Sequence, residues 1–296
     1  MIKKTRIENV LELITPTAPL PVVFDSPHSG QIYPDDFGYN CDLSLLTQIE
    51  DKYVDELFDS AHEHNAYFLR ALFPRSYVDL NRASDDIDDL LVDGSWPDDL
   101  PPIAPTARSH SGIGLFPRLI KAGTPIYNRR LSAVEIMDRV KTYYEPYHDT
   151  LCATLDAAYY NHAYVWHINC HSMPSSSAYS KHQTTLVKKQ SDIVLGNLDG
   201  TTCDRQFTNM LKEFWQSLGY HVTINDPFKG VELISRYSAP TRARHSIQIE
   251  INRALYMDEK TGKKIKNFDV IKQHCTDMVK RCADYAQSQN AQIAAD

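Results

Sequence analysis

The 296-residue sequence has few cysteines, and the six it has are scattered along the chain. No two form a C-x-x-C pair, which argues against a thiolate zinc site and a disulfide framework and is typical of reduced thiols in a cytosolic protein. No apolar run approaches the length of a membrane span, and Glu8 and Glu12 interrupt the segment where a signal peptide would be apolar. We therefore expect a cytoplasmic protein that does not enter a membrane.

The sequence also lacks an excess of basic residues, with 31 Lys and Arg against 38 Asp and Glu. The net charge of −7 comes from residues 84–99, which contain seven Asp and no Lys or Arg. The rest of the chain is balanced, so nucleic acid is not an expected partner. The Asp-rich stretch does not match a calcium-binding EF-hand loop, and we interpret it as a solvated loop that forms part of a lid.

Short apolar runs alternate with longer amphipathic ones. Helices are expected over about 43–64, 131–160, 202–218 and 267–288, and Pro146 should kink or split the second. This alternation predicts a single α/β domain with a mixed, mostly parallel sheet flanked by helices. The predicted strands, rich in Val, Ile and aromatic residues, are Val22–Asp25, Tyr67–Leu72, Tyr77–Leu80, Tyr164–Asn169, Ile193–Leu195, His221–Ile224 and Ser246–Ile251.

One long segment, residues 84–130, is rich in Pro and Gly and shows little periodicity. A long irregular segment inside a compact domain is usually a lid or a binding loop. We expect such a role here.

Two histidines follow predicted strands, His28 in PVVFDSPHSG and His171 in YVWHINCHSMP. Open α/β sheets bind ligands at the carboxyl ends of their strands, so this pair is a candidate half of a zinc site. An ordinary turn histidine is the alternative at His28. His167 lies on the same strand as His171, ~13 Å away at ~3.3 Å per residue, so we expect it to be a core histidine instead.

A catalytic zinc ion often takes a carboxylate as a third protein ligand. Glu50, Asp51 and Asp55 follow on the next predicted helix. Spacing alone does not choose among them, and acids on an exposed helix face are usually only solvated.

Glu250 lies in the last predicted strand, on the face opposite Ile247, Ile249 and Ile251. A glutamate in that position either faces solvent at a sheet edge or lines a cleft. In a cleft beside a metal ion it would serve as a general base. Arg75 and Arg82 flank another predicted strand, where they are either surface residues or a clamp for a carboxylate or oxyanion.

Several of these motifs occur together and in a fixed order: the PHSG turn, VDLNR, GIGLFPR, NCHSMP and IQIEINRALYMDE. In this order they resemble the N-formylglutamate amidohydrolase family, over about residues 20–260. The resemblance implies a phosphorylase/hydrolase-like fold of the zinc carboxypeptidase and aspartoacylase group.

The resemblance also implies roles for particular residues. His28 and His171 match the zinc histidines, and Glu250 matches the general base. Asn81 and Arg82 match a clamp for a substrate carboxylate, and Arg75 lies close to an oxyanion-stabilising arginine. The carboxypeptidase pattern H-x-x-E has Gln31 at its last position here, so we predict that Asp51 is the third ligand, with Glu50 as the alternative.

The implied enzyme is a Zn²⁺-dependent hydrolase that cleaves the small molecule N-formyl-L-glutamate during histidine degradation. A dicarboxylate needs two cations, and we expect Arg118, Arg129 or Arg130 to provide the second, with Arg118 as the first choice. The alternatives are a deacylase of another N-acyl amino acid, a small carboxypeptidase, or a non-catalytic binding protein on the same fold. A serine hydrolase is not expected because the sequence has no G-x-S-x-G motif.

Overall fold

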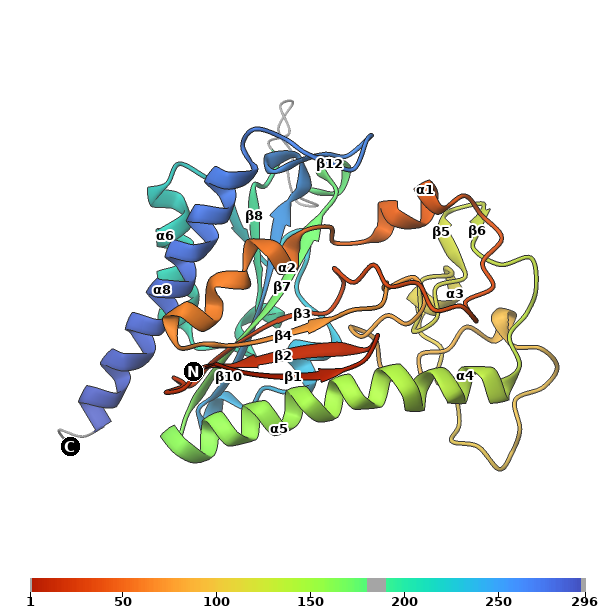
Figure 1. Ribbon diagram of the computed structural model, residues 1–296, viewed down its shortest axis with the longest axis horizontal. Coiled ribbons are helices and arrows are strands. Elements are labelled where there is room, and N and C mark those ends of the chain that lie inside the picture. The colour runs from red at the N-terminus through yellow and green to blue at the C-terminus, as the bar shows by residue number, and fades with distance from the viewer. Residues whose placement is uncertain (1, 180–189, 294–296) are drawn as a thin grey trace.

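The computed structural model describes residues 2–179 and 190–293. Its centre is an eight-stranded sheet in the order β1-β2-β4-β3-β7-β10-β8-β9 (Figure 1). Four of the seven pairings are parallel, namely β4–β3, β3–β7, β7–β10 and β8–β9, as the alternation of runs predicts. The strands of this sheet are β1 Lys3–Ile7, β2 Leu11–Thr15, β3 Val22–Ser26, β4 Tyr67–Ala71, β7 Val165–Met173, β8 Ile193–Gly196, β9 Val222–Ile224 and β10 Arg244–Asn252.

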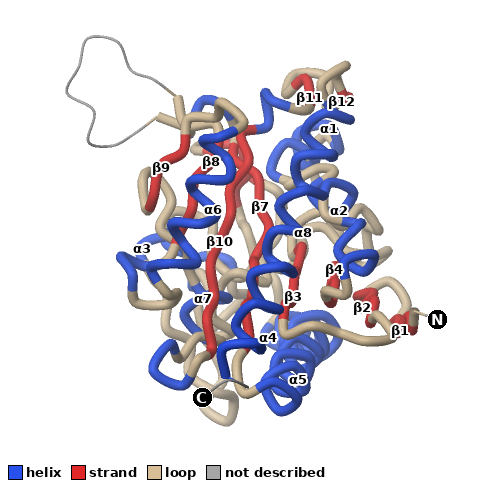
Figure 2. Tube along the Cα trace, turned by 90° about the vertical axis from the view of Figure 1, so that its left-hand side faces the viewer, coloured by secondary structure: helices blue, strands red, loops and turns tan. Residues whose placement is uncertain are grey.

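Helices cover both faces of the sheet, and two short hairpins lie outside it (Figures 1 and 2). The hairpins are β5 Leu119–Lys121 with β6 Thr124–Pro125, and β11 Met257–Asp258 with β12 Lys263–Lys264. The helices are α1 Leu43–Leu46, α2 Val54–Leu57, α3 Ala107–His110, α4 Ala133–Arg139, α5 Glu145–His162, α6 Arg205–Ser217, α7 Glu232–Arg236 and α8 Phe268–Ile293.

Two hydrophobic clusters, one on each face, hold the layers together. Successive residues of β3 show the division: Val22 and Phe24 belong to the cluster under α2, α6 and α8, and Val23 belongs to the cluster under α4 and α5. All three are fully buried. Burial on both faces explains why the central strands are apolar almost throughout.

The structure agrees with the predicted elements in part and departs from them in several places. Tyr77–Leu80 is wrong as a strand: it is buried but irregular, and Asp79 N bonds to Leu115 O instead of a strand. The hairpin β1–β2 was not predicted; β1 forms the edge of the sheet, and β2 pairs with both β1 and β4. A five-residue π-helical turn, Val140–Tyr144, joins α4 to α5 before Pro146. The predicted helix 43–64 is broken into α1, α2 and two 3₁₀ segments.

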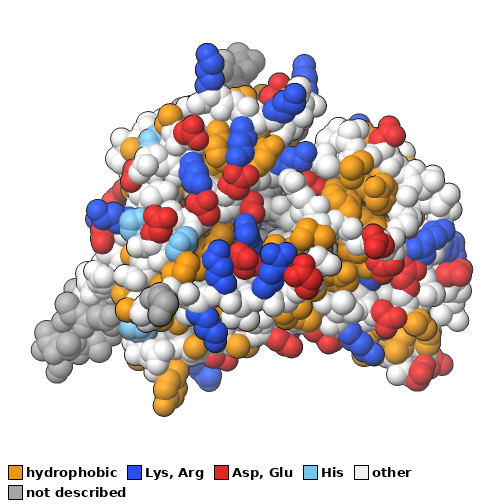
Figure 3. Space-filling model, in the orientation of Figure 1, with side chains coloured by type: hydrophobic (Ala, Val, Ile, Leu, Met, Phe, Trp, Pro, Cys, Tyr) orange, Lys and Arg blue, Asp and Glu red, His pale blue; other side chains and the backbone are white. Residues whose placement is uncertain are grey.

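None of the helices in the described parts of the chain combines the length and the apolar character that a membrane crossing requires. On the face shown in Figure 3, basic and acidic side chains are interspersed.

Candidate active site

Three neighbouring parallel strands carry the first site residues. β3, β7 and β10 run in the same direction, so their carboxyl ends meet at one edge of the sheet. His28 follows β3, and His171 lies near the end of β7. Glu250 of β10 is directly opposite His171 in the register. The sheet therefore brings together three side chains that are more than 200 residues apart at their extremes.

His28, Asp51 and His171 form a compact buried group. One ligand atom from each lies within 4.8 Å of the others, and each residue is at most 2 % exposed. Asp51 Oδ2 is 2.9 Å from His171 Nδ1 and 3.4 Å from His28 Nδ1. His28 Nδ1 is buried and makes no hydrogen bond, an arrangement that a bound cation would satisfy. Two imidazole nitrogens and a carboxylate suit a divalent transition metal such as zinc.

The predicted helix is interrupted around Asp51, and this interruption determines where the Asp51 side chain lies. The 3₁₀ segment Thr47–Ile49 ends at Glu50, whose backbone is extended, and Tyr53 has a positive φ of 67°. Asp51 N donates to His28 O, which ties the break to the first histidine. In a continuous helix, Asp51 would have followed the helix axis and would not have been held beside His28.

Charge and hydrogen bonds keep Asp51 ionised. Burial alone would raise the pKa of its carboxyl. The His171 and His28 side chains beside the carboxylate and the charges of Arg75 and Arg253 outweigh burial and hold that pKa well below its usual value. Arg253 Nη2 donates to Asp51 Oδ1 at 2.8 Å.

The Nε2 atoms of His28 and His171 both face hydrogen-bond acceptors. His28 Nε2 is 2.8 Å from Asp79 Oδ1, and His171 Nε2 is 2.6 Å from Asn169 Oδ1. Asn169 donates its amide to Asp25, which fixes the amide orientation. With a proton on each Nε2, donated to these acceptors, both Nδ1 atoms would be available to a metal ion held together with Asp51.

Glu250 lines the cavity and is not at a sheet edge, because β10 lies between β7 and β8. This position decides between the two alternatives for this residue. Gln248 donates to Glu250 Oε1 at 2.8 Å. Burial and the charge of Asp51 raise the pKa of Glu250 to about 7, against the opposing charge of His171. A carboxylate with such a pKa is suited to exchange protons near neutral pH.

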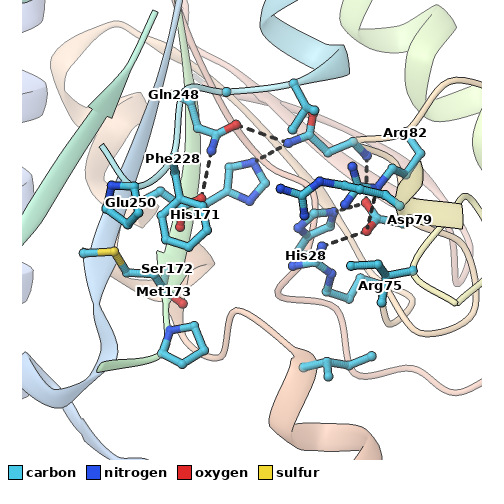
Figure 4. Close-up of a pocket in the computed structure, with 18 of the residues that line it drawn as sticks. His28, Arg75, Asp79, Arg82, His171, Ser172, Met173, Phe228, Gln248 and Glu250 are labelled. Carbon is cyan, nitrogen blue, oxygen red and sulfur yellow. Dashed lines mark hydrogen bonds and ion pairs between the residues drawn. The ribbon is translucent and has the colours of Figure 1, made fainter. Parts of the chain in front are cut away.

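The site opens into a cavity of about 470 Å³. Figure 4 shows Glu250 and His171 on one side of it and His28, Arg75 and Arg82 on the other. Part of the irregular segment 84–130 forms its wall through Arg108, Ile113, Pro117, Leu119 and Ile120. The expected binding-loop role of this segment therefore matches its position.

Comparisons with known proteins agree with this site. The N-formylglutamate amidohydrolase family matches residues 20–257. The chain belongs to this family. N-formylglutamate deformylases of Pseudomonas aeruginosa and Pseudomonas putida are 30% and 27% identical over 248 residues, 81% of this chain and 83% of each relative.

Solved structures extend the comparison. The crystal structure of N-formylglutamate amidohydrolase from Ralstonia eutropha has 38% identity and a TM-score of 0.89, covering 95% of this chain and 99% of that one. A gene product of Agrobacterium tumefaciens, at 16% identity and a TM-score of 0.66 with 95% of each chain covered, shares the fold. The expected family, the mixed α/β fold and the enzyme class are thus confirmed.

The other predicted carboxylates lie outside the histidine group. Asp55 pairs with Arg70 at 3.2 Å. Glu50 is buried and accepts a hydrogen bond from the Tyr33 hydroxyl, and burial raises its pKa to about 7. Geometry therefore selects Asp51, which spacing could not do.

The predicted substrate ligands have different surroundings. Arg82 lines the cavity, and its Nε is buried without a hydrogen bond. Asn81 also lines it, but its amide group already contacts Gln248 and His171, each at 3.3 Å, and its Oδ1 accepts from Leu233 N.

Arg118, Arg129 and Arg130 are not among the residues that line the cavity. Arg118 instead pairs with Asp88 at 2.7 Å, and Arg129 pairs with Glu135 at 2.7 Å. The structure therefore places the expected second cation elsewhere. It also corrects the solvated interpretation of the Asp-rich stretch at two positions, because Asp86 and Asp88 are buried and bonded.

Sequence reasoning missed several polar residues in and around this cavity, and five of them matter to the geometry described above. Asp79 and Arg253 belong to the VDLNR and EINR motifs, so their motifs were a usable signal. Asn169 and Gln248 lie in the NCHSMP and IQIEINRALYMDE motifs and carried the same signal, whereas no motif marks Arg108. The missed residues are Asp79, Arg108, Asn169, Gln248 and Arg253.

Proposed function

We propose that this protein hydrolyses N-formyl-L-glutamate to formate and L-glutamate with the help of a divalent metal ion, Zn²⁺ being the first candidate. The observation that carries the proposal is the buried His28–Asp51–His171 group beside Glu250, in a cavity large enough for a small molecule, in a chain of this family. His28, Asp51 and His171 would hold the ion. When bound, it supplies Lewis-acid chemistry that polarises a carbonyl group and acidifies a water molecule.

Glu250 is the proposed general base. Its carboxylate takes a proton from the attacking water, and the oxygen of that water forms a bond to the formyl carbon. When the C–N bond breaks, Glu250 returns the proton to the departing amine. A pKa of about 7 suits both transfers, because the group can gain and lose a proton at neutral pH.

The arginines supply fixed positive charge. Arg75 lines the cavity and is held by Asp79 at 2.7 Å, so its guanidinium is oriented before substrate arrives. We assign it the stabilisation of the negative charge that develops on the formyl oxygen. Arg82, which has no hydrogen-bonded carboxylate of its own, is assigned to a carboxylate of the substrate. The proposed reaction belongs to histidine degradation in the cytoplasm.

The test is formate release by the purified protein from N-formyl-L-glutamate, before and after chelation and after zinc is added back. We expect turnover that chelation abolishes and zinc restores. Glu250→Gln should lower kcat by about 10²- to 10⁴-fold, the usual contribution of general acid–base catalysis. Glu213→Gln, an exposed change on α6, is the matched control.

Two results would count against the proposal. No formate from folded, zinc-loaded protein would reject the substrate, and N-acetyl and N-succinyl amino acids would be assayed next. Turnover that survives complete metal removal would reject the metal-dependent mechanism while leaving the substrate in place.

A further inference from the structure

The cationic side chains of the cavity fall into two groups, those that donate a hydrogen bond to a carboxylate and those that do not. Arg75 donates to Asp79 at 2.7 Å, and Arg253 donates to Asp51 at 2.8 Å. The third, Lys229, pairs with Asp199 at 2.7 Å. Their charges are already compensated within the protein.

Arg82 and Arg108 make up the second group. The nearest carboxylate oxygen to Arg82 Nε is Asp79 Oδ2 at 3.9 Å, which is too far for a hydrogen bond. Within residues 2–179 and 190–293, the guanidinium of Arg108 has no hydrogen bond or ion pair. Both residues line the same cavity, and two cations that donate to no carboxylate in one cavity are suited to a ligand with two negative charges.

The backbone of Arg108 is fixed although its side chain is free. Thr106 caps helix α3 and accepts hydrogen bonds from the backbone of Arg108 and Ser109. Thr106 is itself held by the buried carboxylate of Asp86, which accepts from its backbone N at 2.8 Å and from its hydroxyl at 3.2 Å. Ile113 N donates to Arg108 O at 3.0 Å. The guanidinium of Arg108 therefore extends from a backbone that hydrogen bonds hold in place.

The two arginines also affect each other. Burial lowers the pKa of Arg82, and the positive charges of Arg75 and Arg108 lower it further. Both guanidinium groups line the one cavity of about 470 Å³, so a single small ligand in it can face both. An anion between them would relieve the repulsion.

We propose that Arg108 binds the side-chain carboxylate of the substrate and thereby selects glutamate over uncharged amino acids, while Arg82 binds the α-carboxylate. This inference rests on the proposed function. Arg82 adjoins Asp79, the partner of His28, so it lies on the metal side of the cavity. The α-carboxylate is attached to the carbon that bears the formamide, so it must stay near the reacting group. The side-chain carboxylate extends two methylene groups further, past apolar Ile113 and Leu119, toward the more exposed Arg108.

The experiment compares two substrates of nearly the same shape, N-formyl-L-glutamate and N-formyl-L-glutamine. In Arg108→Gln, kcat/KM for the glutamate substrate should fall about 10- to 100-fold, the range expected for one charge-assisted hydrogen bond, and mainly through KM. For the glutamine substrate it should change little. Arg82→Gln should instead lower kcat/KM for both substrates to a similar extent. Arg205→Gln, an exposed change at the start of α6, controls for the loss of one positive charge.

Three outcomes would overturn the assignment. An equal loss on both substrates in Arg108→Gln would show that this residue does not read the side chain. A loss confined to the glutamate substrate in Arg82→Gln would reverse the two roles. No turnover of either substrate by the wild-type protein would reject the proposed function itself, and the inference with it. This outcome is distinct from the first two, because those compare the variants with an active wild type.

Discussion

Asp79 joins the two halves of the candidate site through one carboxylate. Its Oδ1 accepts from His28 Nε2 at 2.8 Å, and its Oδ2 accepts from Arg75 at 2.7 Å. Burial would raise the pKa of Asp79, but the charges of Arg75 and His28 outweigh it and hold the pKa well below its usual value. The residue is therefore an anion that orients both His28, a proposed metal ligand, and Arg75, the proposed oxyanion-stabilising arginine.

Replacing Asp79 by Asn should weaken metal binding. The amide keeps the size of the side chain but removes the negative charge that orients His28 and makes it a better ligand. We expect zinc affinity to fall about 10- to 100-fold, as is usual when the partner of a metal-bound histidine is lost. A titration against a competing chelator measures this directly. Asp36→Asn, which removes an exposed carboxylate bonded to Tyr77, is the control; unchanged affinity in Asp79→Asn would contradict the role.

At the scale of elements, helix α5 and the turn before it support the segment that carries Arg82, the proposed substrate-binding arginine. Tyr144, just before α5, donates its hydroxyl hydrogen to Arg82 O. Within α5, His148 Nε2 donates to Leu80 O at 3.0 Å, and the Tyr237 hydroxyl lies 2.8 Å from His148 Nδ1. Together with the bonds of Tyr77 N to Pro74 O and of Asp79 N to Leu115 O, this contact to Leu80 O satisfies part of the backbone of Tyr77–Leu80 without a strand.

His148 should make the folded protein sensitive to acid. Burial, together with the charge of Arg236, lowers its pKa from 6.5 to about 3. Below pH 6.5, His148 therefore binds a proton in the unfolded chain but not in the folded chain, so the free energy of unfolding falls as the pH decreases from 6.5 toward 3. The contribution is at most about 1.4 kcal/mol per pH unit.

Urea unfolding between pH 4 and pH 7.5 tests this prediction. His148→Gln, which cannot be protonated in either state, should show a shallower dependence of unfolding free energy on pH than the wild type. His110→Gln alters an exposed histidine on α3 and should leave the dependence unchanged. Equal slopes in the wild type and His148→Gln would mean that other groups cause the acid sensitivity.

At the scale of the whole molecule, the candidate site is a group of polar residues between the two hydrophobic clusters. Ile247, Ile249 and Ile251 of β10 pack into one cluster with α6 and α8, and Glu250 points the other way. The buried His28–Asp51–His171 group is assembled from three separate segments, so it does not exist in the unfolded chain. Metal binding and folding should therefore be coupled.

We expect zinc to raise the thermal midpoint of unfolding and a chelator to lower it. An ion that binds only the folded state adds about 2.7 kcal/mol when its free concentration is 100 times its Kd. For a chain of this size that corresponds to a rise of roughly 5–10 °C. Scanning calorimetry of the wild type and His171→Gln measures the effect. A rise of equal size in His171→Gln would show that zinc stabilises the protein at some other place.

The sequence by itself determined the features that depend on local pattern. Side chains alternate along a strand, so the polarity of HSIQIEINR separates Glu250 from its isoleucine neighbours without any tertiary information. The His28 and His171 motifs follow apolar runs that became β3 and β7, and ligands gather at such strand ends. The order of motifs then predicted the family, which the comparisons confirm.

Only the tertiary structure decided which side chains are left free to act. Asp51, rather than Glu50 or Asp55, joins the histidines because the predicted helix breaks beside it. Arg118 pairs with Asp88, whereas Arg108 has no partner within the described chain, and nothing in their sequence surroundings separates the two. The physical reason is that a charge is neutralised by whichever opposite charge lies within a few ångströms. Those neighbours come from residues far away in the sequence, so only the folded chain determines them.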